Sequence, residues 1–231
     1  LGLVVAATGA VLHLLLLAAD SAGGLAELRS PADLALALDT RAGRLTLAIL
    51  AVLALAAAAS RWPRLRPLAI LALLATAVIS AARGHSGTSG HGWAVPADAL
   101  HLAAAAIWIG ALVHLVRVVY AAPEDRRETL AYGIRRYASL AIVTVLVAIA
   151  AGLVTALAQF GSPEELLETS YGQTLLVKGA LIGAALAVAL AARTRALGLP
   201  WPEWGLLRRI GIFELASAAV ALLLLALLVG S

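Results

Sequence analysis

Apolar runs of about 20 residues recur along the whole of this 231-residue chain, and this recurrence constrains the fold more than any other feature. Each run is long enough to cross a hydrocarbon core of about 30 Å as a helix. A signal peptide ahead of a soluble domain would supply only one such run. The alternation of apolar and polar residues that is typical of membrane β-barrels is absent. The sequence therefore predicts an all-α, polytopic membrane protein.

The apolar runs predict a single transmembrane helical domain, residues 1–231, with seven spans. The predicted spans are 1–19, 44–59, 67–83, 99–120, 137–160, 174–193 and 210–229. Segment 20–43 is predicted to be an outer loop with a short interfacial helix around 34–38, and segment 123–137 a charged helical inner linker. Because the chain does not begin with Met, we expect it to be a piece of a longer protein with further N-terminal segments.

The placement of the basic residues predicts the orientation of the bundle. Twelve arginines fall in the connections on one side of the predicted spans, whereas four arginines and Lys178 fall on the other. The positive-inside rule then predicts a cytoplasmic N-terminus and an external C-terminus, N-in and C-out. Because the basic residues are sorted in this way, the formal charge of +4 is not evidence for a nucleic-acid partner, and none is expected.

The residue types that are missing exclude several kinds of site. The chain has no Cys, which excludes disulfides and thiolate metal ligands, and no Met, which excludes thioether ligands. The remaining metal-binding side chains are mainly imidazoles and carboxylates. Four of the five histidines, His85, His91, His101 and His114, lie between residues 84 and 115. This concentration predicts a functional region on the outer side.

Two of these histidines, His85 and His91, lie in the Gly- and Ser-rich sequence GHSGTSGHG, where we expect a loop without regular structure. They are either solvated loop residues or metal ligands, and imidazole is the commonest metal-binding side chain. His101 lies about one turn inside the fourth span, where an ionisable group usually faces the protein interior. Asp98, three residues earlier, either orients the His101 ring or caps the helix.

The expected depth in the membrane decides which of the remaining histidines, His114 and His13, could share a site with His101. His114 lies thirteen residues beyond His101, about 20 Å deeper along the helix axis, so it is not expected to share a site with it. His13 lies in the outer half of the first span and could approach His101. The predicted metal ligands are therefore His85, His91, His101, Asp98 and His13.

Several motifs resemble the copper resistance protein D (CopD) family of bacterial inner-membrane proteins. The strongest is GHS followed by ADALHLAAAAIWIGALVHL. Four others occur in order: LDTRAGRL (38–45), RRYASLAIVTVLVAIAAGLVTAL (135–157), SYGQTLLVKGAL (170–181) and RRIGIFELASA (208–218). Together these motifs extend over most of the chain.

This resemblance implies a multi-pass protein that handles copper at the bacterial cytoplasmic membrane, often with a periplasmic copper-binding partner or fused domain. By position, His85, Asp98 and His101 match the family's GH and D-x-x-H elements. Trp108 and Gly110 match its W-x-G element, and Tyr171, Gly172 and Lys178 match its Y-G-x-x-L-x-x-K element. His13, His91 and His114 are not carried over. Routes for Cu(I) are commonly lined by Met, and this chain has none. The oxidation state of the copper is therefore left open.

Three functions are compatible with these observations. The leading hypothesis is a non-enzymatic membrane protein that captures a copper ion at the outer histidines and moves it into or across the membrane. The second is an electron carrier with one haem held between two histidines, for which His13 and His101 are the candidate pair. The third is a membrane scaffold for the assembly of a copper enzyme.

Overall fold

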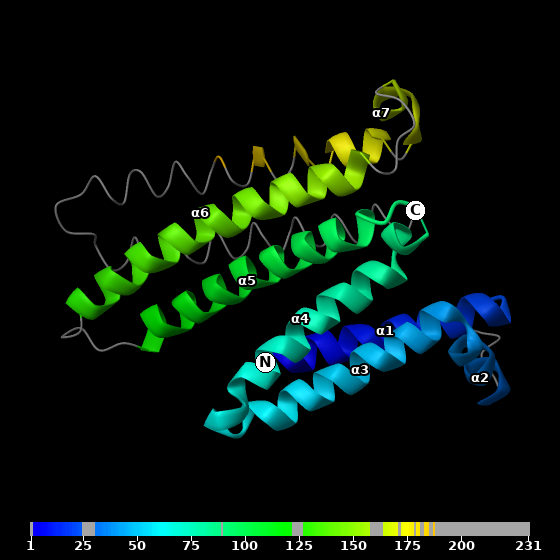
Figure 1. Ribbon diagram of the computed structural model, residues 1–231, viewed down its shortest axis with the longest axis horizontal. Coiled ribbons are helices and arrows are strands. Elements are labelled where there is room, and N and C mark those ends of the chain that lie inside the picture. Colours follow the sequence, from blue (N-terminus) through cyan, green and yellow to red (C-terminus); the bar gives the residue numbers. More distant parts are fainter. Residues whose placement is uncertain are drawn as a thin grey trace. The chain divides into compact units, whose positions relative to one another are not determined.

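The computed structural model describes residues 2–24, 31–88, 90–121 and 127–157, and further along 164–170, 172–177, 179–180, 183–184 and 187. Within these residues the long elements are helices and none is a strand, so the predicted all-α class is confirmed for this part of the chain. The helices are α1 (Gly2–Ala22), α2 (Pro31–Asp39), α3 (Arg41–Ser60), α4 (Arg66–Arg83), α5 (Ala94–Ala121), α6 (Arg127–Leu157) and α7 (Glu165–Glu168). Two 3₁₀ turns, η2 (Pro63–Leu65) and η3 (His85–Gly87), complete the order (Figure 1).

Five stretches among the described residues are helical, long and apolar enough to cross a membrane. They are Gly2–Ala22, Arg41–Ser60, Pro63–Arg83, Ala94–Val118 and Ser139–Ala156. Each overlaps one of the first five predicted spans. The span predicted at 174–193 lies partly, and that at 210–229 wholly, outside the described residues. The count of seven spans and the N-in, C-out orientation therefore stay predictions.

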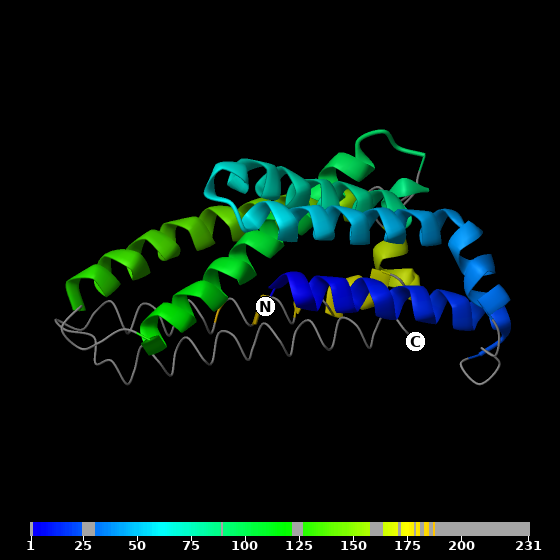
Figure 2. The ribbon, with the colours of Figure 1, turned by 90° about the horizontal axis from the view of Figure 1, so that it is seen from below.

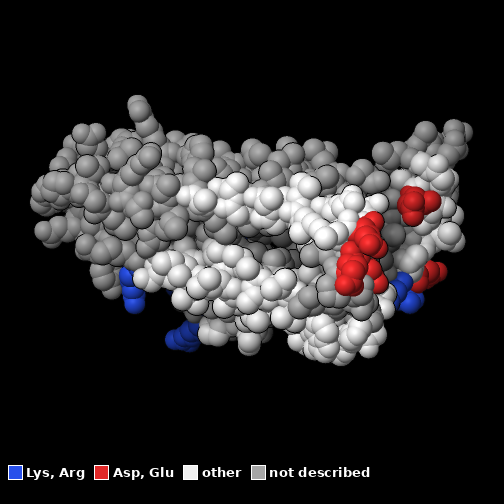
Figure 3. All heavy atoms as spheres, turned by 90° about the horizontal axis from the view of Figure 1, so that it is seen from above, with Lys and Arg blue, Asp and Glu red and all other residues white. Residues whose placement is uncertain are grey.

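The surfaces of these helices suit a lipid environment. Large apolar side chains are exposed along them, such as Ile70 and Leu71 of α4, which are 60% and 62% exposed. An exposed apolar surface of this extent is rare on a soluble monomer. In Figure 3 the described charged side chains lie in groups toward the left and right of the view, and the described surface between these groups is uncharged.

The chain divides into two compact units, of which residues 1–104 and 147–159 form the first. In this unit α3 packs against both α1 and α4, and α2 contacts α1 and α3 at one end (Figures 1 and 2). The buried cluster contains Ala10, Ile49 and Leu53. Alanine occupies all of the buried positions on α4, and such small side chains let membrane helices approach closely.

The second unit, residues 105–146 and 160–231, contains the later part of α5 and the first part of α6. Among its described residues, Leu112 and Thr144 are buried. The Thr144 hydroxyl donates to the carbonyl oxygen of Leu140 at 2.8 Å, within its own helix. A hydroxyl in an apolar helix is thus satisfied by the backbone one turn earlier.

The corner between α2 and α3 explains part of the LDTRAGRL motif. The Thr40 hydroxyl donates to the Ala37 carbonyl at 2.7 Å and accepts from the Gly43 N–H at 2.9 Å. Thr40 is therefore the N-cap of α3 and also ties it to the end of α2. A side chain at Gly43 would overlap the Ala37 backbone, so glycine is required there. The predicted short helix in segment 20–43 is confirmed as α2.

Two local predictions for the segment between α4 and α5 are corrected. The loop between α4 and α5 contains the turn η3, so it has more regular structure than its glycines indicated. Helix α5 begins at Ala94 rather than near residue 99, because the Ala94 N–H already donates to the His91 carbonyl at 3.0 Å. Pro96 lies in the first turn, where its missing N–H leaves no hydrogen bond unmade. Asp98 is therefore inside the helix, and the interpretation of it as the cap is wrong.

Candidate metal site

The loop of residues 84–93, which we call the histidine loop, joins α4 to α5 and contains His85 and His91. Its first turn is closed by hydrogen bonds of the backbone. The Gly84 N–H donates to the carbonyls of Ser80 and Ala81 at 3.2 Å each, and the Gly87 N–H donates to the Gly84 carbonyl at 3.0 Å. The backbone of His85 is thus held in η3, while its side chain lies outside the described part of the structure.

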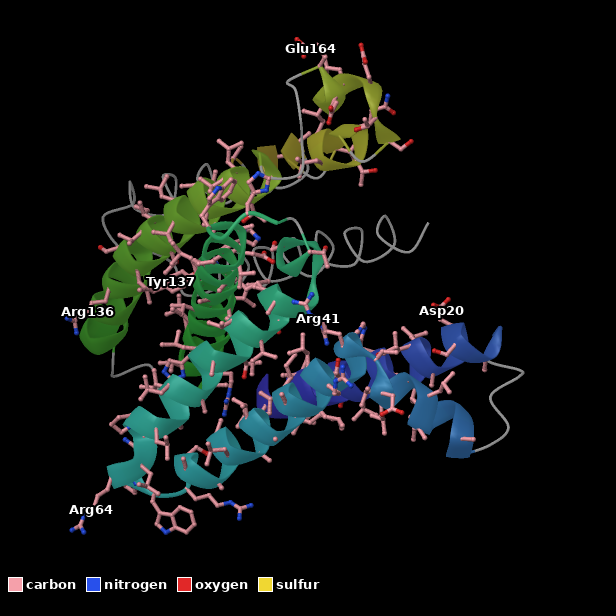
Figure 4. The ribbon with its side chains drawn as sticks, turned by 45° about the vertical axis from the view of Figure 1, so that its right-hand side comes forward. Asp20, Arg41, Arg64, Arg136, Tyr137 and Glu164 are labelled. Atoms are coloured by element: carbon pink, nitrogen blue, oxygen red, sulfur yellow. The ribbon has the colours of Figure 1, made fainter. Side chains whose placement is uncertain are left out.

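Arg41, the first residue of α3, fastens this turn from 46 residues away in the chain. Its Nη1 and Nη2 donate to the Gly87 carbonyl at 3.2 and 3.3 Å, and Nη2 also donates to the Ala82 carbonyl at 3.2 Å. Figure 4 shows Arg41 beside the end of α4 from which the loop departs, whereas Arg64 projects from the opposite end. A side chain at Gly87 would overlap the Ala82 carbonyl, so the contact needs glycine.

Ser86 fastens the same turn to α5. Its side chain is buried, and its hydroxyl donates to the Asp98 carboxylate at 3.0 Å. The carboxylate that was predicted to orient the His101 ring therefore binds the histidine loop. Among the described hydrogen bonds, none joins Asp98 to His101. The two residues are nevertheless one helical turn apart on the same face of α5.

His101 has its own orienting partner on α6. Its Nδ1 lies 2.7 Å from the carbonyl oxygen of Ala148. Because a carbonyl only accepts, Nδ1 carries a proton, and in the neutral form of the ring the electron pair lies on Nε2. A Cβ at Gly152 would lie 2.8 Å from this Nδ1, so only glycine lets the ring rest against the α6 backbone. A ring nitrogen bonded to a backbone carbonyl is the usual arrangement behind a metal-binding histidine.

His91 lies near the far end of the histidine loop and is exposed. Its ring packs at a tilt against Trp93, with 5.3 Å between the ring centroids. The Ala94 N–H donates to its carbonyl, so the residue adjoins the start of α5. This position leaves the imidazole at the surface on the side of the protein that the sequence predicts to be external.

His13 lies in a different environment, within α1. Its Nε2 is buried and has no hydrogen-bond partner among the described residues. The Arg83 guanidinium lies within electrostatic range of the ring and donates to the Thr46 hydroxyl at 3.1 Å. Thr46 is fully buried and in turn donates to the Ala42 carbonyl at 2.8 Å. A cation beside the ring disfavours a second cation there.

The described side chains do not by themselves assemble a complete metal site. Within the described ranges, no group of three or more His, Asp or Glu residues is close enough to hold a metal ion. The predicted set of five ligands includes His85, whose side chain is not described, so the set as a whole is not tested. His114 is exposed on α5 and belongs to the second unit.

The remaining positions of the resemblance are placed only in part. Trp108 is half-buried, and Gly110 faces open space. Gly172 is buried and its N–H donates to the Thr169 hydroxyl at 3.0 Å. Tyr171 and Lys178 lie outside the described residues.

Sequence reasoning missed the residues that position the histidines. Arg41 and Gly152 lie in two of the motifs, LDTRAGRL and the alanine-rich stretch before residue 157, but nothing in those motifs indicated contacts with a histidine. Ala148 contributes only its carbonyl, which leaves no signal in a sequence. For Ser86 the signal was its place next to His85 in GHS.

The described part of the chain is helical and suited to a membrane, with His101 and the histidine loop held by hydrogen bonds to neighbouring helices. Residues 132–228 match the family described as Copper resistance protein D. A similar protein, the Copper transport protein CutJ of Bacillus subtilis (strain 168), is 33% identical over 132 residues, which are 53% of this chain. Those residues are 24% of the relative, so the chain spans about a quarter of its length. No solved structure matches the chain. Over residues 132–228 the chain is thus similar to the CopD family, the family that its motifs resemble.

Proposed function

We propose that this protein captures a copper ion at its external face and passes it into or across the bacterial cytoplasmic membrane. The observation that carries the proposal is the hydrogen bond from His101 Nδ1 to the Ala148 carbonyl. It makes Nδ1 the donor and directs the ring, so that the electron pair of the neutral imidazole lies on Nε2, where a metal ion can bind. The match to the family supports copper as the metal, because the matching family and the relative are both named for copper.

The other ligands of the proposed site come from the histidine loop. His85 and His91 supply imidazoles, which bind copper in either oxidation state. Asp98 holds the loop through Ser86 and places a negative charge beside the site. His13 is the remaining candidate ligand because its Nε2 has no partner among the described residues, although Arg83 opposes a cation there. A periplasmic copper-binding protein would deliver the ion.

The test measures the copper content of purified protein after equilibration with copper and removal of the excess. We expect the double variant His85→Ala with His101→Ala to lose most of the bound copper and to reduce copper uptake by cells. His114→Ala is the matched control, because this histidine lies on the same helix in an exposed position, and it should bind as the wild type does. A separate His13→Ala variant assigns the role of the residue in α1.

Three results would oppose the proposal. If the double variant keeps its full copper content and copper uptake, the histidines are not the copper site. A Soret absorption band in the purified protein would favour the haem-binding electron carrier, for which the Nε2 atom of His101 is also suited. Recovery of a copper enzyme with a wild-type chain that binds no copper would favour the scaffold.

A further inference from the structure

We propose that Arg41 is a positioning residue for copper capture: it latches the histidine loop to α3 and α4 and so holds the backbone around His85 in one place. This inference rests on the proposed function and adds a residue that makes no contact with the metal. Its basis is the set of three hydrogen bonds from one guanidinium to the carbonyls of Ala82 and Gly87, on both sides of His85.

The latch acts on the backbone immediately around His85. One carbonyl belongs to the last turn of α4, and the other to Gly87, the last residue of η3. Glycines make up much of the loop, and glycine loses more conformational freedom on folding than any other residue. Without a contact to the rest of the protein, the loop would therefore sample many conformations. Ordering it when the ion binds would cost conformational entropy and weaken the copper affinity.

The position of Arg41 is itself fixed. It follows Thr40, whose hydroxyl bonds to both α2 and α3, so the arginine leaves the first turn of α3 in a defined direction. Gly87 allows the guanidinium to approach, because a Cβ there would lie 3.1 Å from Nη2 and would overlap the Ala82 carbonyl. Two separate sequence motifs, LDTRAGRL and GHSG, thus meet at one contact.

Ser86 supplies a second tie, to Asp98 on α5. His85 precedes this serine directly and lies between the two carbonyls that Arg41 binds. The loop is therefore held to α3 and α4 by one contact and to α5 by another. His101 lies one turn beyond Asp98 on α5 and is fixed in turn by Ala148. This chain of contacts connects the arginine to both proposed ligands.

The planar fork of the guanidinium is essential to the inference. Arginine can direct several N–H groups at two carbonyls at once, whereas the single ammonium group of lysine cannot reproduce that geometry. Arg44 is the matched control: it is also basic and exposed in the first turn of α3, and no contact of its side chain with the loop is among the described hydrogen bonds.

The experiment compares the full-length wild type with Arg41→Gln, Arg41→Lys and Arg44→Gln in detergent. Hydrogen–deuterium exchange of residues 84–93 is measured without copper, and the copper dissociation constant is measured by competition with a chelator. We expect both Arg41 variants to exchange faster in this loop and to bind copper about tenfold more weakly at unchanged stoichiometry, as for other residues that orient ligands. Arg44→Gln should change neither quantity.

The outcomes separate this inference from the proposed function. If the loop of both Arg41 variants exchanges hydrogen at the wild-type rate, the proposed role of Arg41 is wrong. It is also wrong if exchange becomes faster while copper affinity stays unchanged. A wild-type protein that binds no copper would overturn the proposed function and the affinity part of the latch, while exchange would still decide whether Arg41 holds the loop. If Arg41→Gln fails to fold, Arg41→Lys keeps the charge and gives the answer.

Discussion

At the scale of single residues, the contact between His101 and Gly152 leaves no room for a larger side chain at residue 152. The ring rests on the backbone of α6, with its Nδ1 2.7 Å from the Ala148 carbonyl. A methyl group at residue 152 would come within 2.8 Å of Nδ1 and 3.1 Å of Cε1. The ring would have to move, since the other side of this contact is helix backbone. The glycine therefore lets the ring reach the carbonyl that orients it.

We predict that Gly152→Ala destabilises the protein by about 1–3 kcal/mol, the usual cost of inserting a methyl group into a well-packed site. It should also weaken copper binding, because the bond to Ala148 would lengthen. Thermal unfolding in detergent and a copper-binding titration measure the two effects. Gly133→Ala, in the same helix but with nothing within 4 Å of its Cβ position, is the control. It should be neutral or slightly stabilising. Equal behaviour of the two variants would contradict the prediction.

The residue scale also shows what sequence reasoning could not reach. His101 and Asp98 were predicted as a pair because they share a helix face, yet their described hydrogen bonds go to different elements. Helix periodicity reports which face a residue occupies, but the partner on that face comes from another helix. Arg41 was used only as a charge in the orientation argument, since its contact with Gly87 crosses 46 residues.

At the scale of elements, the corner between α2 and α3 is held largely by one hydroxyl. Thr40 satisfies the Gly43 N–H at the start of α3 and donates to the Ala37 carbonyl at the end of α2. The first N–H groups of a helix have no partner within the helix, so a side-chain acceptor there has a measurable effect. The same corner orients Arg41.

We predict that Thr40→Ala lowers the free energy of unfolding by about 1 kcal/mol, the typical cost of losing an N-cap. Thr40→Ser keeps the hydroxyl and should retain most of the stability. Faster hydrogen exchange in the first turn of α3 is expected only for the alanine variant. If serine and alanine destabilise equally, the methyl group rather than the hydroxyl would be the important part of this side chain.

Elements were predicted well where apolar length alone decides them. The described spans, α1 and α3 to α6, overlap the predicted ones, because the membrane thickness fixes the length of an apolar helix. Boundaries were less accurate where local hydrogen bonds decide them. Helix α5 starts a turn early through the His91 carbonyl, and glycine-rich sequence concealed η3.

At the scale of the whole molecule, the predicted sidedness places the histidine loop and the turn after α3 on opposite faces of the membrane. The structure is consistent with the alternation, since α3 and α4 are joined by a short turn, η2, at the end opposite to the loop. The chain lacks cysteine, so single cysteines can be introduced without any background labelling.

We predict that Thr88→Cys, in the histidine loop, reacts with a membrane-impermeant maleimide on intact cells, because this loop is expected to be external. Ser60→Cys, at the end of α3, should react only after the membrane is permeabilised. Both residues are exposed. The reverse pattern would show that the N-in, C-out orientation is wrong and would move the proposed capture site to the cytoplasmic face.

The hydrogen bonds from Arg41 end on main-chain oxygens, and this has a consequence for how such proteins can diversify. Carbonyls are present whatever side chains the loop carries, so only Gly87 is constrained by the contact itself. The bonds from Arg41 therefore set no requirement on the side chains at the other positions of the loop. Substitutions there can change the groups offered to a metal ion while the attachment of the loop backbone to α3 is kept.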